Sequence, residues 1–257
     1  MVNIVWRIIA VVQLIALVGV LCEKSGDWCE IEEEFCNGKS HIACQKNKFP
    51  RGECFDVQIV KMDELLVQAI LDRHNYYRNE IACGRIGGYP TASKMPVMEW
   101  DEELEFLATQ HVQHCNFQHD GCRASYQYPH AGQNLGFHAT TGHLENLANV
   151  TQFMIDEWFQ EYTLVDPSVV GKFEKSDLKA GHFTVVVNEA NKRVGCGMIT
   201  YTYKEDNRVW NAVMFTCDYA KTNILNWPIY TVGAPTTACK EIEMVPNKHY
   251  AGLCCAP

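Results

Sequence analysis

Cysteine content constrains this chain more than any other feature. The 257 residues include 13 cysteines. Twelve of them follow residue 22, in a front, a middle and a tail group: Cys29, Cys36, Cys44 and Cys54; Cys83, Cys115, Cys122, Cys196 and Cys217; Cys239, Cys254 and Cys255. Zinc sites favour Cys-x-x-Cys pairs, which this sequence lacks. An even number of cysteines in an exported chain instead predicts disulfides.

The amino-terminal residues predict that export. Arg7 is followed by an apolar run, residues 8–21, in which Gln13 is the one polar side chain. The run is shorter than the roughly 18 residues that a membrane span requires and suits the apolar core of a signal peptide. We therefore expect residues 1–22 to be a signal peptide and the rest of the chain to have no membrane span.

Composition indicates a globular domain and excludes some partners. Aromatic residues make up 11% and charged residues 21% of the chain, and the formal net charge is −9. A negative chain without a basic patch is a poor ligand for nucleic acid or an anionic membrane. We divide the mature chain into a cysteine-rich extension (residues 23–57), a main domain (58–222) and a cysteine-containing tail (223–257).

Three helices are predicted from caps and apolar spacing. Asp63 can cap a helix that runs to about Ala82, and Asp101 can cap a second, whose apolar residues recur every three or four positions. A third is expected over residues 144–162. It carries the sequon Asn149-Val150-Thr151, which makes Asn149 a candidate glycosylation site.

Strands are predicted in the second half of the chain. Residues 183–187 form an apolar, β-branched run, a second strand opens at Val194, and residues 210–219 alternate apolar and polar side chains. This places His182 at a strand end, where it either faces a cleft or merely finishes the strand. We expect residues 131–136 to be a loop. Helices followed by neighbouring strands predict a layered fold with antiparallel pairing.

Several short motifs occur together and in order. The sequence resembles the cysteine-rich secretory, antigen 5 and pathogenesis-related (CAP) superfamily, and most nearly its insect antigen 5 branch. The resemblance covers nearly the whole mature chain and is carried by these stretches: His74-Asn75-Tyr76-Tyr77-Arg78, Gly132-Gln133-Asn134-Leu135, Gly181-His182-Phe183-Thr184, Val194-Gly195-Cys196-Gly197, residues 36–44 and His119-Asp120-Gly121-Cys122-Arg123.

The resemblance implies a fold and a disulfide pattern. The fold is of the α+β class, a three-layer α-β-α sandwich with a central antiparallel sheet and a cleft. The pairs carried over by position are Cys29–Cys44, Cys36–Cys122, Cys54–Cys115 and Cys196–Cys217. Within the tail we expect Cys239 to pair with Cys254, which leaves the pairing of Cys83 and Cys255 open.

The resemblance also implies a site. In the family two histidines and two acidic residues converge in the cleft and can hold a divalent metal, often zinc. The matching positions are His119, His182 and Glu161, while the second carboxylate position is Gln133. An amide is a poorer zinc ligand than a carboxylate. We therefore expect weak, pH-sensitive metal binding by His119, Glu161 and His182, with Gln133 beside them as a hydrogen-bonding neighbour.

A second departure from the family concerns the residues after Gly181-His182-Phe183-Thr184. Relatives continue with glutamine, an apolar pair and tryptophan, whereas this chain has Val185, Val186, Val187 and Asn188. Any function of the family that depends on that glutamine and tryptophan is therefore in doubt here.

Three classes of function compete, and no catalytic residue is assigned. The sequence contains neither His-Glu-x-x-His nor Gly-x-Ser-x-Gly. A metal-dependent hydrolase would also need a general base, but Glu161 would be a ligand and Gln133 cannot accept a proton. The favoured interpretation is a secreted binding module whose partner is a small apolar ligand or lipid. The alternative is a module that interacts with an extracellular protein, as a toxin does.

Overall fold

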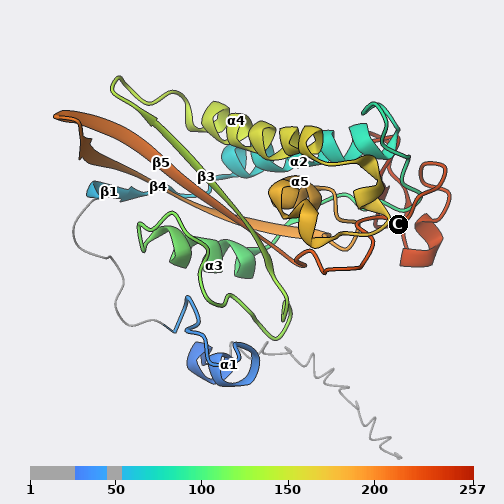
Figure 1. Cartoon of the computed structure of the whole chain (residues 1–257), viewed down its shortest axis with the longest axis horizontal. Coiled ribbons are helices and arrows are strands. Elements are labelled where there is room, and N and C mark those ends of the chain that lie inside the picture. Colours follow the sequence, from blue (N-terminus) through green and yellow to red (C-terminus); the bar gives the residue numbers. More distant parts are fainter. Residues whose placement is uncertain (1–26, 45–53) are drawn as a thin grey trace, which may run out of the picture.

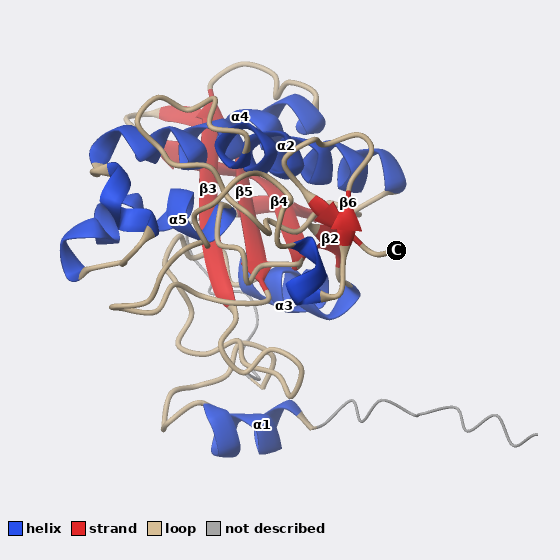
Figure 2. Cartoon of the chain, turned by 90° about the vertical axis from the view of Figure 1, so that its right-hand side faces the viewer, coloured by secondary structure: helices blue, strands red, loops and turns tan. Residues whose placement is uncertain are grey.

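A twisted sheet between two layers of helices forms the body of the molecule, as Figures 1 and 2 show. The computed structural model describes residues 27–44 and 54–257. The helices are α1 (Trp28–Phe35), α2 (Glu64–Ala82), α3 (Glu102–Val112), α4 (Leu147–Gln160) and α5 (Gly181–Val186). The strands are β1 (Phe55–Ile59), β2 (Glu99–Trp100), β3 (Gly132–Thr140), β4 (Arg193–Glu205), β5 (Arg208–Tyr219), β6 (Val245–Pro246) and β7 (Cys254–Cys255). The expected α-β-α sandwich is confirmed.

The main sheet has the order β1-β4-β5-β3, with antiparallel pairs along it, and β2 pairs with β4 in parallel. Helices α2 and α4 cover one face and α3 covers the other (Figure 1). Short 3-10 helices at Glu161–Leu164, Pro167–Val170 and Lys175–Ala180 lead from α4 into α5. Strands β6 and β7 form a separate pair in the tail. No helix in the described ranges is long and apolar enough to span a bilayer.

The expected caps start both helices that flank the sheet. The Asp63 carboxylate accepts the Leu66 N–H at 2.9 Å, and the Asp101 carboxylate accepts the Glu103 and Leu104 N–H groups at 3.0 Å. Each cap satisfies N–H groups that have no partner within the helix. Helix α4 is shorter than the expected 144–162, because the Asn146 side chain caps it and the chain turns into a 3-10 helix after Gln160.

Two expected elements were wrong. Residues 183–187 do not form a strand: most of them belong to α5, although their β-branched side chains favour a strand locally. Conversely, the expected loop at 131–136 lies mostly in β3, which pairs with β5 without interruption from Gly132 to Thr140. In both segments tertiary contacts override local propensity, since β3 takes the place beside β5 and α5 packs on β3 and α4.

The amino-terminal extension is tied to the body by disulfides. Cys29–Cys44 closes the extension on itself, while Cys36–Cys122 and Cys54–Cys115 join it to the segment that follows α3. With Cys196–Cys217 and Cys239–Cys254, these are the five pairs expected from the sequence. Cys83 and Cys255 are not bonded to each other. The expected signal peptide lies outside the described residues.

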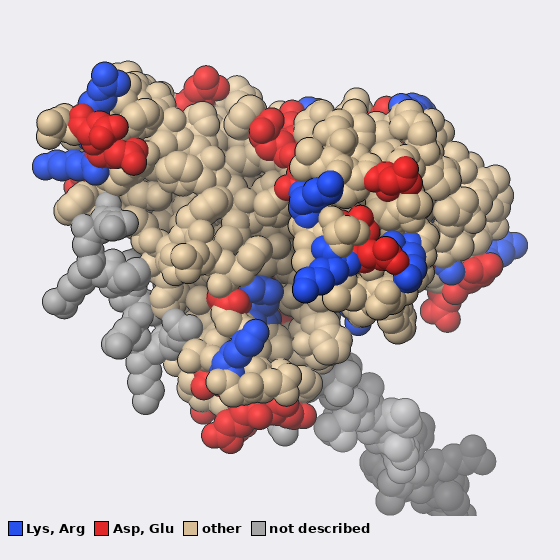
Figure 3. All heavy atoms as spheres, viewed as in Figure 1, with Lys and Arg blue, Asp and Glu red and all other residues tan. Residues whose placement is uncertain are grey.

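Helix α1 is the acidic part of this extension. Acidic side chains gather over it at the lower end of Figure 3. The residues concerned are Glu30, Glu32, Glu33 and Glu34. Its Glu32 carboxylate accepts the His41 N–H, so part of this charge holds the turn that follows the helix.

Arg78 of α2 ties the helix to two neighbouring segments from inside the core. Its side chain is fully buried and donates to the carbonyls of Pro96, Val186 and Asn188 at 2.8–3.1 Å. One turn earlier His74 contacts the Tyr219 hydroxyl at 2.8 Å. His74 and Arg78, which share a face of α2, therefore hold the scaffold together and do not line the cleft.

Replacing Arg78 with lysine should destabilise the fold. Lysine has the charge but lacks the planar set of donors, so it leaves buried carbonyls without partners. We expect Arg78→Lys to lower the free energy of unfolding by about 2–4 kcal/mol in chemical denaturation. Arg85→Lys, at an exposed arginine paired with Glu80, is the matched control and should have no measurable effect. Equal stabilities of the two variants would contradict this assignment.

Candidate functional site

A cavity of about 540 Å³ opens between the segment after α3, the start of α5 and the end of α4. Its polar walls include all four residues that the sequence singled out and three more charged groups. The seven are Lys39, His119, Asp120, Arg123, Gln133, Glu161 and His182.

The Glu161 carboxylate fixes both the start of α5 and the His182 ring. One oxygen accepts from the His182 Nδ1 at 2.7 Å, and the other accepts the backbone N–H groups of His182 and Phe183 at 2.9 and 3.2 Å. Glu161 reaches this position because it directly follows α4. Since a carboxylate only accepts, the His182 Nδ1 carries a proton and, in the neutral ring, Nε2 retains its lone pair.

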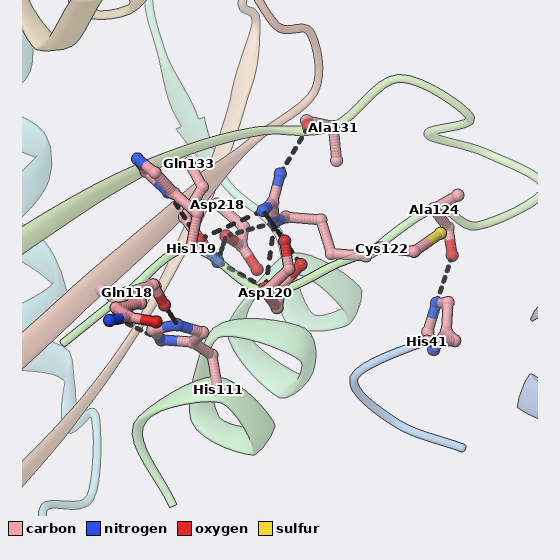
Figure 4. A network of polar contacts seen from close by, with 12 residues as sticks. His41, His111, Gln118, His119, Asp120, Cys122, Ala124, Ala131, Gln133 and Asp218 are labelled. Atoms are coloured by element: carbon pink, nitrogen blue, oxygen red, sulfur yellow. Dashed lines mark hydrogen bonds and ion pairs between the residues drawn. The ribbon is translucent and has the colours of Figure 1, made fainter. Parts of the chain in front are cut away.

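Gln133 is the centre of a polar network (Figure 4). Its amide oxygen accepts from the His119 Nδ1 at 2.9 Å and from Arg123 at 3.2 Å. Its amide nitrogen donates to Asp120 at 2.8 Å and to Asp218 at 3.0 Å. Both hydrogens of the amide are therefore used on carboxylates, an arrangement that a glutamate at this position could not reproduce.

The register of the sheet creates this network. Gln133 of β3 lies directly opposite Asp218 of β5, so their side chains stand on the same face. Arg123 enters from the loop after α3, with an ion pair of 2.9 Å to Asp120 and a longer one of 3.8 Å to Asp218. Sequence analysis missed Asp218 because the residues of β3 were interpreted as a loop, which hid its partner.

Burial sets the protonation of two groups here. Desolvation raises the pKa of the fully buried Asp218 carboxyl well above its ordinary value, with Asp120 adding to the rise and Arg123 opposing it. Burial also lowers the pKa of His119, and the charges of Arg123 and His182 contribute to the lowering. His119 is therefore held in the neutral form, the one that can bind a metal.

The expected three-ligand metal set is not formed. Across residues 27–44 and 54–257, no group of three or more His, Cys, Asp or Glu side chains could hold a metal ion. Both oxygens of Glu161 accept hydrogen bonds from His182 and Phe183. His119 and His182 each use Nδ1, and no described residue hydrogen-bonds their Nε2 atoms. These donors fit a weak site of two imidazoles.

A groove with a mixed apolar and polar lining adjoins the polar cavity. It has a volume of about 390 Å³, lies along β3 and α4, and shares Glu161 and His182 with the cavity. Its apolar walls are Leu135, Phe137, Phe153, Met154 and Trp158. Phe153 is 51% exposed.

Comparison with known proteins assigns the chain to a family. Residues 71–219 match the model described as "CAP: Cysteine-rich secretory protein family". The chain belongs to this family. It is 34% identical over 226 residues to Venom allergen-1 of Aedes aegypti, covering 87% of this chain and 86% of that relative. It is 31% identical over 215 residues to a Venom allergen 3 homolog of Dinoponera quadriceps, covering 80% and 90%.

Solved structures of CAP proteins share the fold. "Structure of BmVAL-1" aligns with a TM-score of 0.62 at 20% identity, covering 77% of this chain and 97% of that one. "Crystal structure of NaASP2 with Zn2+" aligns with a TM-score of 0.57 at 24% identity, covering 75% and 96%. The CAP architecture is thus kept at low sequence identity.

Asp218→Asn should stabilise the protein increasingly as the pH rises. An aspartate whose pKa is raised in the folded state lowers the free energy of unfolding of the protein at pH values above its unfolded-state pKa of about 3.9. The reason is that the charged form of the side chain is disfavoured only in the folded protein. Asparagine does not titrate and still offers Gln133 an acceptor. We expect a gain of about 1–2 kcal/mol at pH 7 that shrinks toward pH 4.

Urea denaturation at intervals from pH 4 to pH 8 measures this gain. Asp206→Asn, at the exposed turn between β4 and β5, is the control and should show no such trend. A difference between Asp218→Asn and the wild type that does not change with pH would contradict the buried, proton-favouring environment of Asp218.

Proposed function

We propose that this chain is a secreted binding protein that holds a small amphiphilic lipid without chemically changing it. The polar end of the ligand lies in the cavity beside His119 and His182, and the apolar chain lies in the groove along β3 and α4. The observation that carries the proposal is that the two spaces adjoin, since Glu161 and His182 line both of them. Apolar walls with a few oriented polar groups are typical of ligand sites.

The groove is held open by packed and hydrogen-bonded side chains. The Trp158 indole N–H donates to the Leu135 carbonyl at 2.9 Å, so α4 is fixed at a set distance from β3. The same ring stacks on Phe215 with centroids 5.5 Å apart and planes 6° from parallel. A ligand entering a preformed groove avoids the entropic cost of ordering it.

The bonding of the polar groups favours binding over hydrolysis. A general base needs an available acceptor of suitable pKa. Glu161 accepts hydrogen bonds at both oxygens, and Gln133 is neutral and bonded at both ends of its amide. These groups position their neighbours and are poorly placed to take a proton from water.

A second candidate function is recognition of an extracellular protein at the rim of the cavity. Leu178 lines the cavity and is 58% exposed, while Trp227 is 62% exposed. Trp227 lies close by, because its carbonyl accepts from Phe173, another cavity residue. Exposed apolar side chains at a rim are typical of protein contacts.

A divalent metal such as zinc fits the polar end as a weakly held group. Its donors would be the Nε2 atoms of His119 and His182, oriented by Gln133 and Glu161 through the opposite ring nitrogens. Bound there, it would supply a positive charge to attract the anionic end of a ligand.

Lipid binding should depend on Phe153. We expect delipidated protein to bind a fluorescent fatty acid, and Phe153→Ser to weaken that binding by about fivefold to tenfold, because the variant loses apolar contact area. Leu65→Ser is the control, since Leu65 is 82% exposed on α2 and lies outside the groove. Failure of the wild type to bind, or equal affinities of both variants, would contradict the proposal.

Zinc binding should require both histidines. We expect His119→Ala and His182→Ala each to abolish the binding seen by calorimetry, while the exposed His143→Ala has no effect. Binding should weaken as the pH falls, because protonated imidazole cannot coordinate, and the lowered pKa of His119 moves the protonation of that ring to more acid pH than usual for histidine.

A further variant tests how the His119 ring is supported. Gln133→Glu should tighten zinc, since a carboxylate in contact with His119 makes the ring a stronger donor. It should also lower the stability of the fold, because the new charge lies beside Asp120 and Asp218. No uptake by the wild type would show that these residues form only a structural cluster.

A further inference from the structure

An aromatic pocket lies on the sheet beyond the end of α3. Helix α3 covers the sheet as far as Val112, which packs on Ile199. The strand alternation of β4 then brings Tyr201, Tyr203 and Glu205 onto the same face as Ile199, past the end of the helix. The pocket there has a volume of about 380 Å³.

Four rings form a curved wall around this pocket. Phe117 and Phe137 have centroids 5.7 Å apart with planes tilted by 53°. Phe137 and Tyr203 are 6.2 Å apart and also tilted by 53°, and Tyr203 and Tyr201 are 6.2 Å apart and tilted by 42°. Because each ring is tilted relative to the next, several ring faces are presented to one space. Rings stacked in parallel would not do this.

The wall is rigid and comes from separate parts of the chain. Phe137 belongs to β3, the tyrosines belong to β4, and Phe117 follows the Cys54–Cys115 disulfide, whose two cysteines also line the pocket. Beside the wall, Trp210 of β5 lies directly opposite Tyr203 and stacks on it at 6.2 Å with planes 14° apart. The pocket is therefore formed before any ligand arrives.

The pocket carries a negative charge. Its described lining contains Glu205 and Asn116 beside the rings and cysteines, and no lysine, arginine or histidine. Arg208 lies opposite Glu205 in the hairpin, but no ion pair between the two is found in the described part of the chain. The net charge of −9 adds a long-range attraction for cations.

We propose that this pocket binds a small organic cation with a quaternary ammonium group of the choline type. Ring faces attract such a cation through their negative electrostatic potential, and the methyl groups fill an apolar space that a hydrated metal ion would not. Glu205 supplies the opposite charge at the edge. This site shares Phe137 with the lipid groove, but its other lining residues are separate.

The test compares choline with its uncharged isostere. Calorimetry or NMR titration of the full secreted protein uses choline and 3,3-dimethylbutan-1-ol, which has the same shape with carbon in place of the charged nitrogen. We expect choline to bind at least fivefold more tightly. Equal affinities would overturn the proposal, and so would the absence of choline binding.

Variants locate the binding. Tyr203→Leu and Glu205→Gln should each weaken choline binding by about threefold to tenfold. Val209→Thr is the control, because Val209 is exposed on the same hairpin but pairs with Lys204, whose side chain points to the opposite face. Loss of affinity in the control as large as in the two variants would overturn the assignment.

NMR titration of the wild-type protein locates the choline site independently if a variant fails to fold. Choline should shift the NMR signals of Phe117, Tyr203 and Glu205, and shifts confined to other regions would overturn the site. Vesicles of phosphatidylcholine and of phosphatidylglycerol then distinguish the source of the ligand. Selective binding to the former assigns the site to a lipid headgroup, whereas binding of free choline without vesicle binding assigns it to a soluble amine.

Discussion

The geometry of the cavity depends on the Glu161 carboxylate. It joins the end of α4 to the start of α5, because its two oxygens accept three N–H groups from His182 and Phe183. These contacts satisfy backbone donors that the short helix leaves unpaired and hold the imidazole in one orientation. The boundary between the polar cavity and the groove lies at this contact, since both spaces include Glu161 and His182.

The opposite wall depends on covalent anchors. His119 lies between Cys115 and Cys122, and each of these cysteines is bonded to the amino-terminal extension. Bonds that close long loops restrict the unfolded chain and also limit how far the loop can move in the fold. The extension therefore anchors the loop that carries His119 and also lines the cavity through Lys39, which gives a physical reason for a cysteine-rich segment ahead of the main domain.

Local signals in the sequence predicted the parts of the fold that are locally determined. Asp63 and Asp101 start helices because an aspartate cap acts within three residues. The pairing of the cysteines needed the family resemblance, since spacing alone leaves many connectivities open. The position of Gln133 beside the histidines was anticipated in the same way, but its bonds to Asp120 and Asp218 require the register of β3 on β5, which no local pattern shows.

Helix α5 shows why some elements of the fold could not be predicted from the sequence. A run of valines favours a strand when only neighbouring residues are considered. Here the carboxylate of Glu161, about twenty residues earlier, caps the helix, and Arg78 binds the carbonyls of Val186 and Asn188 at its other end. The decision between helix and strand is therefore made by two side chains that are distant in the sequence.

The most direct test of this account is the tautomer of His182, read from the ¹⁵N chemical shifts of its neutral ring. The hydrogen bond to Glu161 predicts a protonated Nδ1 and an unprotonated Nε2 that faces the cavity. Glu161→Gln should remove this preference, since an amide can also donate. A wild-type ring protonated at Nε2 would contradict the claim that Glu161 orients the histidine and leaves Nε2 available for binding.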